Sequence, residues 1–421
     1  MAFEDPTMKP TRHTLRTVFL LLLLCAAGAA GIASERLSIG LEVLATGHPD
    51  LVAGKKIALL VGLASYDQSM RHSIDRLARA TTITSIFTGD QWPRKLIESA
   101  SGTKQIDAVT QAPVNIIRDP LEKPRAEQLN GAEIIVIDIQ DIGIRFFNAV
   151  TLLAQFLELG KQAGIPVIVL DRPNPIGASK VSGPLLDVQF RSRFGVYPIP
   201  LVYGMTFGEL ALFFNKVFGL NADLTVVGME NYHRDVTYRN CGLHWAMPSE
   251  HLPDPESPVY YATTGFLGEM GIFSTGVGTT RPFHYVLAPW IDSDALVSKL
   301  TVLNLPGVAF LPTVVRPYYG LFQQKRVPGI EIVVTGHQTY DPVMTGIAIL
   351  HTLWTLYPDK IPLSNQTAAE GVDILLGGSG IRTAIIQGKG VEDLRNIVKS
   401  SVSDFMTKRK QFLIYPEART P

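Results

Sequence analysis

The chain has 421 residues, with 38 basic and 38 acidic side chains, and apolar residues make up 46% of it. This length exceeds what one ordinary hydrophobic core accommodates and predicts two domains, while the apolar fraction excludes a disordered protein. The balanced charge provides no electrostatic basis for binding nucleic acid or an anionic membrane surface, so we expect no nucleic-acid partner.

The N-terminal segment has the order of a secretory signal peptide. Basic residues, including Arg12 and Arg16, precede an apolar run at residues 18–25, and small residues follow as far as Ala33. This order is typical of exported proteins, and the apolar run is too short for a comfortable membrane span. We expect residues 1–33 to be removed, leaving a periplasmic or extracellular protein with no stable membrane span.

Short apolar runs alternate with helical patterns over the first half of the mature chain. Continuous apolar runs are typical of strands that are covered on both faces, as in parallel sheets. The alternation therefore predicts a parallel sheet with right-handed crossovers. The expected strands are residues 55–63, 81–87, 133–139, 167–170 and 224–227, and the expected helices are residues 70–80, 149–163 and 206–218.

The composition changes at about Cys241, which is the one cysteine that remains after signal removal. Pro and Gly become frequent, and aromatic residues such as Tyr260, Tyr261 and Phe266 lie in segments that we interpret as irregular. Later strands are expected at 308–311 and 330–335, and helices at 343–356 and 391–408. The sequence thus predicts an α/β protein with a parallel-sheet domain at 34–240 and a smaller α+β domain at 241–421.

Polar side chains follow three of the predicted strands at their carboxyl ends. Because these ends share one edge of a parallel sheet, where ligands bind, the side chains are candidates for a polar site. Each acid could instead be a loop cap, a turn residue or a local ion-pair partner, and each arginine could pair with Asp141 or Asp171. The candidates are Asp90 after the second strand, Asp138, Gln140, Asp141 and Arg145 after the third, and Asp171 and Arg172 after the fourth.

The sequence contains no pattern that requires a metal or a cofactor. Residues 276–280 (GVGTT) resemble a glycine-rich phosphate loop but lack its third glycine and a clear strand–helix context. His233, His244 and His251 are too widely spaced for a helical metal-binding pair. We therefore expect neither a metal nor a cofactor.

Five longer strings connect the chain to a known family. They are residues 136–146 (VIDIQDIGIRF), 169–175 (VLDRPNP), 197–209 (YPIPLVYGMTFGE), 278–283 (GTTRPF) and 288–292 (APWID). With them the chain resembles, from residue 37 to 415, the exo-β-N-acetylmuramidases of the NamZ type, also known as DUF1343. The resemblance implies a Rossmann-like N-terminal domain, a smaller C-terminal domain, and removal of β-1,4-linked N-acetylmuramic acid from the non-reducing ends of peptidoglycan fragments or muropeptides.

The loops of the expected site depart from the family pattern. The family's Asn-x-Thr/Ser-Gly turn is replaced by residues 63–66 (LASY), and its Pro-Glu-His-Gly by 89–92 (GDQW). Its Arg-Phe-Tyr-Thr-Tyr becomes 145–149 (RFFNA), which loses both phenols. Further on, Glu269 is kept, whereas an asparagine and an arginine become Ile272 and Val277.

These departures leave two interpretations open. One is a divergent glycosidase with a reshaped sugar pocket, and the other is a catalytically inactive relative that binds a cell-wall glycan or a protein. A pocket lined by Leu63, Phe147, Ile272 and Val277 would favour the second interpretation.

The resemblance also suggests roles for the candidate residues. Most glycosidases need one acid to protonate the leaving oxygen and a second carboxylate as base or nucleophile. Asp90 is our first candidate because it holds the position of the family's glutamate, and Glu269 and Asp141 are further catalytic candidates. The substrate-binding candidates are Asp138 and Gln140 for sugar hydroxyls, a role that Asp141 could also take, and Asp171. Arg145 and Arg172 are candidates for binding the lactyl carboxylate, and Trp290 could stack on a sugar or belong to the core.

Overall fold

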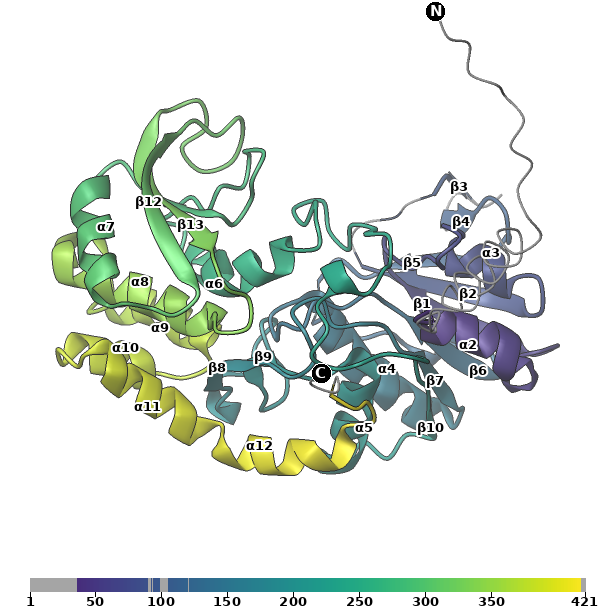
Figure 1. The fold of residues 1–421 in the computed structure, drawn as a ribbon. Helices are drawn as coiled ribbons and strands as arrows, with labels where there is room; N and C mark the ends of the chain where they lie inside the picture. The colour runs from purple at the N-terminus through teal and green to yellow at the C-terminus, as the bar shows by residue number, and fades with distance from the viewer. Residues whose placement is uncertain (1–35, 90–91, 93, 99–104, 120, 418–421) are drawn as a thin grey trace, which may run out of the picture. The chain divides into compact units, whose positions relative to one another are not determined.

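The computed structural model describes residues 36–417 apart from 90–91, 93, 99–104 and 120, and the side chains of 366–369 (Figure 1). The signal-like segment and its expected cleavage site lie outside these residues, and so does Asp90. The chain from Ser38 onward forms a single compact unit.

A six-stranded parallel sheet lies at the centre of the N-terminal part, in the order β10-β7-β6-β1-β2-β5. The chain starts in the middle with β1, proceeds outward to β5, and returns past β1 to β6. This is the strand order of a Rossmann-like sheet, with the switch point between β1 and β6. The strands are β1 Lys56–Val61, β2 Thr82–Thr88, β5 Val114–Ile116, β6 Ile134–Asp138, β7 Val167–Leu170 and β10 Leu224–Val227.

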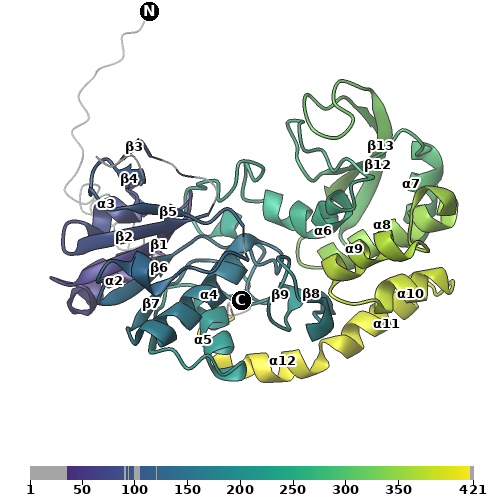
Figure 2. The same cartoon turned by 180° about the vertical axis from the view of Figure 1, so that it is seen from behind.

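Helices cover both faces of this sheet. The long helices α4 (Asn148–Ala163) and α5 (Phe207–Val217) pack on one face, where side chains of β1 and β6 join their apolar residues in one core cluster. The short helix α2 (Gly40–Gly47) lies on the other face against β7 and β10 (Figures 1 and 2). The near-complete burial of the central strands explains why their sequences are continuously apolar.

Of the helices predicted in this part, α5 begins at the expected residue, whereas α3 (Ser73–Leu77) is shorter than expected. Helix α5 begins as predicted, because Thr206 and Glu209 form a reciprocal capping box. The helix expected at 70–80 is shorter, because α3 covers only Ser73–Leu77. Met70 has a left-handed backbone, and His72 caps the helix by accepting a hydrogen bond from the Ile74 amide, so the helix cannot begin earlier.

The C-terminal part contains a three-stranded antiparallel sheet in the order β11-β13-β12, accompanied by helices. Strand β11 is Tyr285–Leu287, β12 is Val308–Val315 and β13 is Val327–Val334. The expectation of irregular structure around Tyr260, Tyr261 and Phe266 was wrong, because all three lie in α6 (Ser257–Glu269). This helix is buried on most of its surface, so it lacks the polar face that helical periodicity depends on. The helix expected at 391–408 is divided at Val402 into α11 (Val391–Ser401) and α12 (Ser403–Arg409).

The end of the chain returns to the N-terminal sheet. Helix α11 contacts β8, and α12 continues toward α5, as both views show (Figures 1 and 2). The guanidinium of Arg409 donates hydrogen bonds to the carbonyls of Gly204 and Ala178. The remaining elements are β3 Leu96–Glu98, β4 Gln105–Asp107, β8 Val181–Leu185, β9 Pro200–Tyr203, α7 Ser293–Val302, α8 Pro342–Leu356, α9 Gln366–Leu376 and α10 Gly380–Ile386.

Candidate functional site

A pocket of about 270 Å³ opens at the carboxyl ends of the central strands. It lies at the ends of the neighbouring strands β1 and β6, between which the strand order of the sheet reverses. Open α/β sheets bind ligands at this switch point. The segment 248–251 and Tyr261 of α6 complete its wall. The sheet contributes 61–64 at the end of β1, Thr88 and Gly89 at the end of β2, and Ile139 and Gln140 after β6. Phe147, the N-cap of α4, and Asn148 and Ala149 of its first turn also line the pocket.

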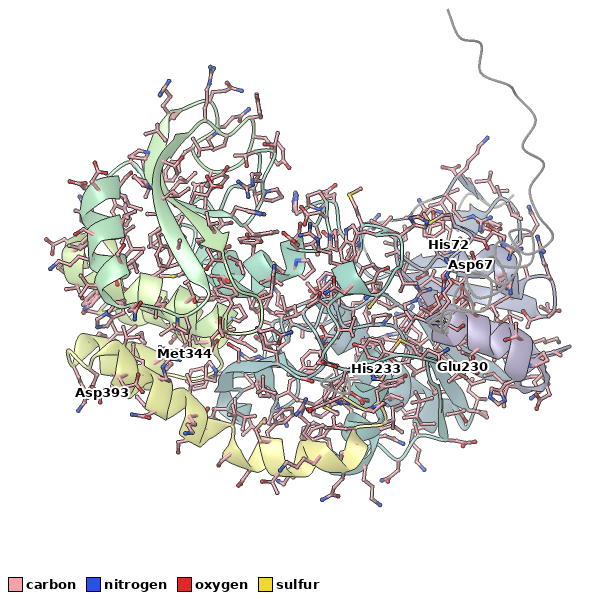
Figure 3. All side chains as sticks on the ribbon, in the orientation of Figure 1. Asp67, His72, Glu230, His233, Met344 and Asp393 are labelled. Atoms are coloured by element: carbon pink, nitrogen blue, oxygen red, sulfur yellow. The ribbon has the colours of Figure 1, made fainter. Side chains whose placement is uncertain are left out.

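The turn after β1 is fixed by buried polar contacts. The Ser65 hydroxyl accepts a hydrogen bond from the Gly62 amide at 2.9 Å and donates one to the Asp138 carbonyl, which joins β1 to β6. The imidazole of His72 lies 3.3 Å from the Gly62 carbonyl, and His72 and Asp67 occupy the same region in Figure 3. Burial lowers the pKa of His72, so a neutral ring supports this wall.

Gln140 is the one described residue among our sequence-based candidates that lines the pocket. Its amide nitrogen donates to the carbonyls of Asp141 at 2.7 Å and Pro173 at 2.9 Å. These two bonds hold the loops after β6 and β7 together. Gln140 is therefore both part of the pocket wall and a link between two strand ends.

Asp90, our first catalytic candidate, lies outside the described residues. The two residues that directly precede it in the chain, Thr88 and Gly89, both line the pocket. Its assignment therefore stays a prediction.

Asp138 and Arg172 form a buried ion pair behind the pocket. The guanidinium donates from Nε to one carboxylate oxygen at 2.5 Å and from Nη2 to the other at 2.8 Å. Its remaining nitrogen, Nη1, donates to the Tyr66 carbonyl at 3.0 Å. Arg172 thus pairs with Asp138 rather than with Asp141 or Asp171, and neither member of the pair lines the pocket.

Asp141 and Asp171 are also buried and bind groups of the fold. Asp141 accepts hydrogen bonds from the Gly143 amide at 2.6 Å and from the Tyr203 hydroxyl. Asp171 accepts from Thr206, the Gly208 amide and the Tyr415 hydroxyl. Burial raises the pKa of each carboxyl to about 6. Neither carboxylate lines the pocket.

Arg145 lies deep in the protein and binds three main-chain carbonyls. Its guanidinium donates to Pro184 at 3.0 Å, Ile199 at 2.9 Å and Leu375 at 3.2 Å. No carboxylate of the described chain pairs with it, and burial lowers its pKa to about 9. Arg145 therefore connects β8 and β9 to the end of α9, away from the pocket.

Glu269 and Trp290 lie in the C-terminal part. Glu269 is exposed at the end of α6, with its carboxylate 4.0 Å from Arg193. The ring of Trp290 packs against Phe273 and Tyr357, which matches the core alternative. Neither residue lines the pocket.

The replaced family positions divide into two groups. Leu63 and Phe147 line the pocket, whereas Ile272 and Val277 pack against the C-terminal core and do not reach it. The apolar lining that would favour an inactive relative is thus present in part.

Sequence reasoning missed the segment 248–251 as part of the site. Glu250 is the only carboxylate among the described residues that line the pocket, and His251 lies beside it. Glu250 follows no strand and belongs to no recognisable motif. Only the tertiary fold brings this segment to the carboxyl edge of the sheet.

The described residues contain no group of three His, Cys, Asp or Glu side chains arranged to hold a metal ion. Over the same part of the chain, no helix combines the length and apolarity needed to cross a membrane.

A parallel sheet in this order, with a pocket at its switch point, defines a Rossmann-like α/β protein with a candidate ligand site beside the sheet. The family models for exo-β-N-acetylmuramidase NamZ match residues 57–256 (N-terminal model) and 259–415 (C-terminal model). The chain is 35% identical over 383 residues to the peptidoglycan β-N-acetylmuramidase NamZ of Bacillus subtilis, covering 90% of this chain and 92% of the relative. The chain therefore belongs to the NamZ family.

Two solved structures of DUF1343 family proteins from Bacteroides fragilis have the same fold. The first is 29% identical, with a TM-score of 0.83, and the match covers 90% of this chain and 99% of that one. The second is 23% identical, with a TM-score of 0.70, and the match covers 91% and 100% of the two chains. The resemblance predicted from the sequence is confirmed.

Proposed function

We propose that this protein is a muramidase-type glycoside hydrolase that releases N-acetylmuramic acid from the non-reducing ends of peptidoglycan fragments. The observation that carries the proposal is membership of the NamZ family over both parts of the chain, together with a pocket at the switch point of the sheet. The similarity to the peptidoglycan β-N-acetylmuramidase of Bacillus subtilis supports the substrate class.

The composition of the pocket suits a single sugar. A volume of about 270 Å³ is at the small end of ligand pockets, which favours a terminal residue over an internal glycan segment. Leu63 and Phe147 offer apolar surface for the C–H face of a sugar ring. Gln140, Asn148 and Ser249 provide polar groups for hydroxyl and acetamido groups.

Most glycosidases hydrolyse the glycosidic bond with a proton donor and a second carboxylate. We assign the proton donor to Asp90, which holds the family's glutamate position and follows the pocket residue Gly89 in the chain. Glu250 lines the pocket and is the carboxylate available to act as the base. Because aspartate is one methylene shorter than glutamate, we expect slower hydrolysis than in relatives with glutamate at this position.

The proposal is tested with the purified mature protein and two chromogenic substrates, a β-N-acetylmuraminide and a β-N-acetylglucosaminide. We expect release of the chromophore from the first and little from the second, which lacks the lactyl group. Binding of the muraminide without any hydrolysis would contradict the proposal and identify an inactive relative.

A further inference from the structure

The loop that joins β12 and β13 presents two exposed tyrosine rings next to the pocket. Tyr318 is 66% exposed and Tyr319 is 51% exposed, although large apolar rings are usually covered. The ring centroid of Tyr319 lies 6.4 Å from that of His251, which lines the pocket. Tyr319 therefore continues the pocket wall outward, and Tyr318 precedes it directly in the same loop.

The position of this loop is fixed by its neighbours. The Tyr318 amide donates to the Gly278 carbonyl at 2.7 Å, and the Gln324 amide donates to the Pro317 carbonyl at 2.8 Å. Gly278 has a φ of +89°, and a Cβ atom there would lie 2.1 Å from the Tyr319 carbonyl oxygen. The glycine-containing segment 276–280 is thus shaped to hold the tyrosine loop, which explains its composition without a phosphate ligand.

The same loop carries three exposed cations and no acid. Arg316, Lys325 and Arg326 are exposed, and none forms an ion pair with a carboxylate of the described chain. Flat aromatic rings fit the C–H faces of sugars, and unpaired cations attract carboxylates. A ligand that combines sugar rings with carboxylates matches both features, and peptide-substituted glycans of the cell wall have this chemistry.

We infer that Tyr318 and Tyr319 form a stacking platform for the N-acetylglucosamine on the leaving-group side of the scissile bond. The three cations would face the acidic peptide of the N-acetylmuramic acid that follows this sugar in the glycan. This inference rests on the proposed function, because it places the terminal sugar in the pocket. It adds a second binding region that contacts only substrates longer than one sugar.

The test compares a Tyr318→Ala/Tyr319→Ala double variant with the native chain on two substrates. For an oligosaccharide muropeptide with terminal N-acetylmuramic acid, we expect KM to rise on the order of tenfold, as expected for the loss of two aromatic contacts. For the chromogenic β-N-acetylmuraminide, which has no sugar on the leaving-group side, we expect unchanged kcat and KM. Val302→Ala, at an exposed apolar residue of α7, is the matched control and should leave both substrates unaffected.

Calorimetric binding of the muropeptide separates this inference from the proposed function. If the native chain fails to hydrolyse either substrate but binds the muropeptide, and the double variant loses that binding, the platform stands while the proposed function fails. If the native chain hydrolyses both substrates and the double variant matches it on both, the platform is refuted while the proposed function stands. An equal rise in KM for both substrates in the double variant would also refute a role confined to the leaving-group side.

Discussion

Tyr415 donates its phenolic hydrogen to the carboxylate of Asp171 at 2.6 Å and thereby joins the end of the chain to the carboxyl end of β7. The same hydroxyl accepts a hydrogen bond from the Met229 amide at 2.9 Å. Asp171 was a candidate for sugar binding, and in the structure it binds this tyrosine together with Thr206 and Gly208. The C-terminal segment is therefore part of the structure that supports the strand ends.

We predict that Tyr415→Phe lowers the free energy of unfolding by about 2 kcal/mol, because it removes both hydrogen bonds of the phenol and leaves the buried Met229 amide without its acceptor. Denaturant unfolding at pH 7 measures the change. Tyr318→Phe is the control, since it alters an exposed ring and should change stability by less than about 0.5 kcal/mol. Equal stability of the two variants would contradict a structural role for the Tyr415 hydroxyl.

The buried carboxyl of Asp141 should make stability depend on pH. Burial raises its pKa to about 6 in the folded state, above the unfolded value of about 3.9. The folded state therefore holds this proton more tightly, and the stabilisation that is present below about pH 4 is lost as the pH rises through about 6. Its size is about 1.4 kcal/mol for each unit of pKa difference.

Asp141→Asn removes this titration while its amide oxygen can still accept from Gly143 and Tyr203. We expect the free energy of unfolding to fall less between pH 4.5 and pH 7 in the variant than in the native chain, as measured by denaturant unfolding at both values. Because Asp141 lies outside the pocket, hydrolysis should persist. If the pH dependence of stability is the same in the variant and the native chain, Asp141 does not have a raised pKa in the folded state. A complete loss of hydrolysis in a folded variant would restore Asp141 as a catalytic candidate.

Arg145 should matter for stability rather than for ligand binding. Replacing it with Met leaves the carbonyls of Pro184, Ile199 and Leu375 buried without their donor, and we expect a loss of about 3 kcal/mol or more. Gly377→Ala should disturb the same guanidinium, because a Cβ atom at position 377 would lie 2.7 Å from the Arg145 Nη2 atom. Thermal unfolding should show both losses. A stable Arg145→Met protein with weakened muropeptide binding would instead support the original ligand-binding role.

The mature protein should begin at Ser34. This expectation follows from the basic, apolar and small-residue order of the first 33 residues. N-terminal sequencing of the protein recovered outside the cytoplasm checks it. A mature chain that still carries residues 20–24 would contradict the prediction of a cleaved signal.

Much of the fold could be predicted because its strands are buried on both faces. The strands 167–170 and 224–227 were predicted with their observed bounds, and the Thr206–Glu209 capping box marked the start of α5. Helix α6 was missed because burial on most sides removes the polar face that reveals a helix in a sequence. The edge strand β5 was missed because three residues carry too little pattern.

Most residues that line the candidate pocket were not among the predicted site residues. The pocket lies at the carboxyl ends of the parallel strands, where the sequence placed the candidate site, and Gln140 lines it. The buried partners of Arg145, Arg172 and Asp171 come from distant segments, and no local pattern distinguishes such a residue from one that faces a ligand. Glu250 reaches the pocket through the tertiary fold alone.

Asp90 carries the catalytic assignment, and its replacement should affect the rate rather than the fold. We expect Asp90→Asn to lower hydrolysis of the chromogenic muraminide by about 10²- to 10⁴-fold, the usual contribution of a general acid. The Asp90→Glu variant should still be less active than relatives that have glutamate at this position. Leu63 and Phe147 lack the polar groups that the family pattern has at their positions. Full activity in Asp90→Asn would reassign the proton donor.

The most direct test of the central claim is mass spectrometry of the products formed from a muropeptide whose non-reducing end is N-acetylmuramic acid. The account predicts free N-acetylmuramic acid and a remaining glycan that is shorter by one sugar. Internal fragments, or an intact muropeptide after prolonged incubation with folded protein, would contradict it.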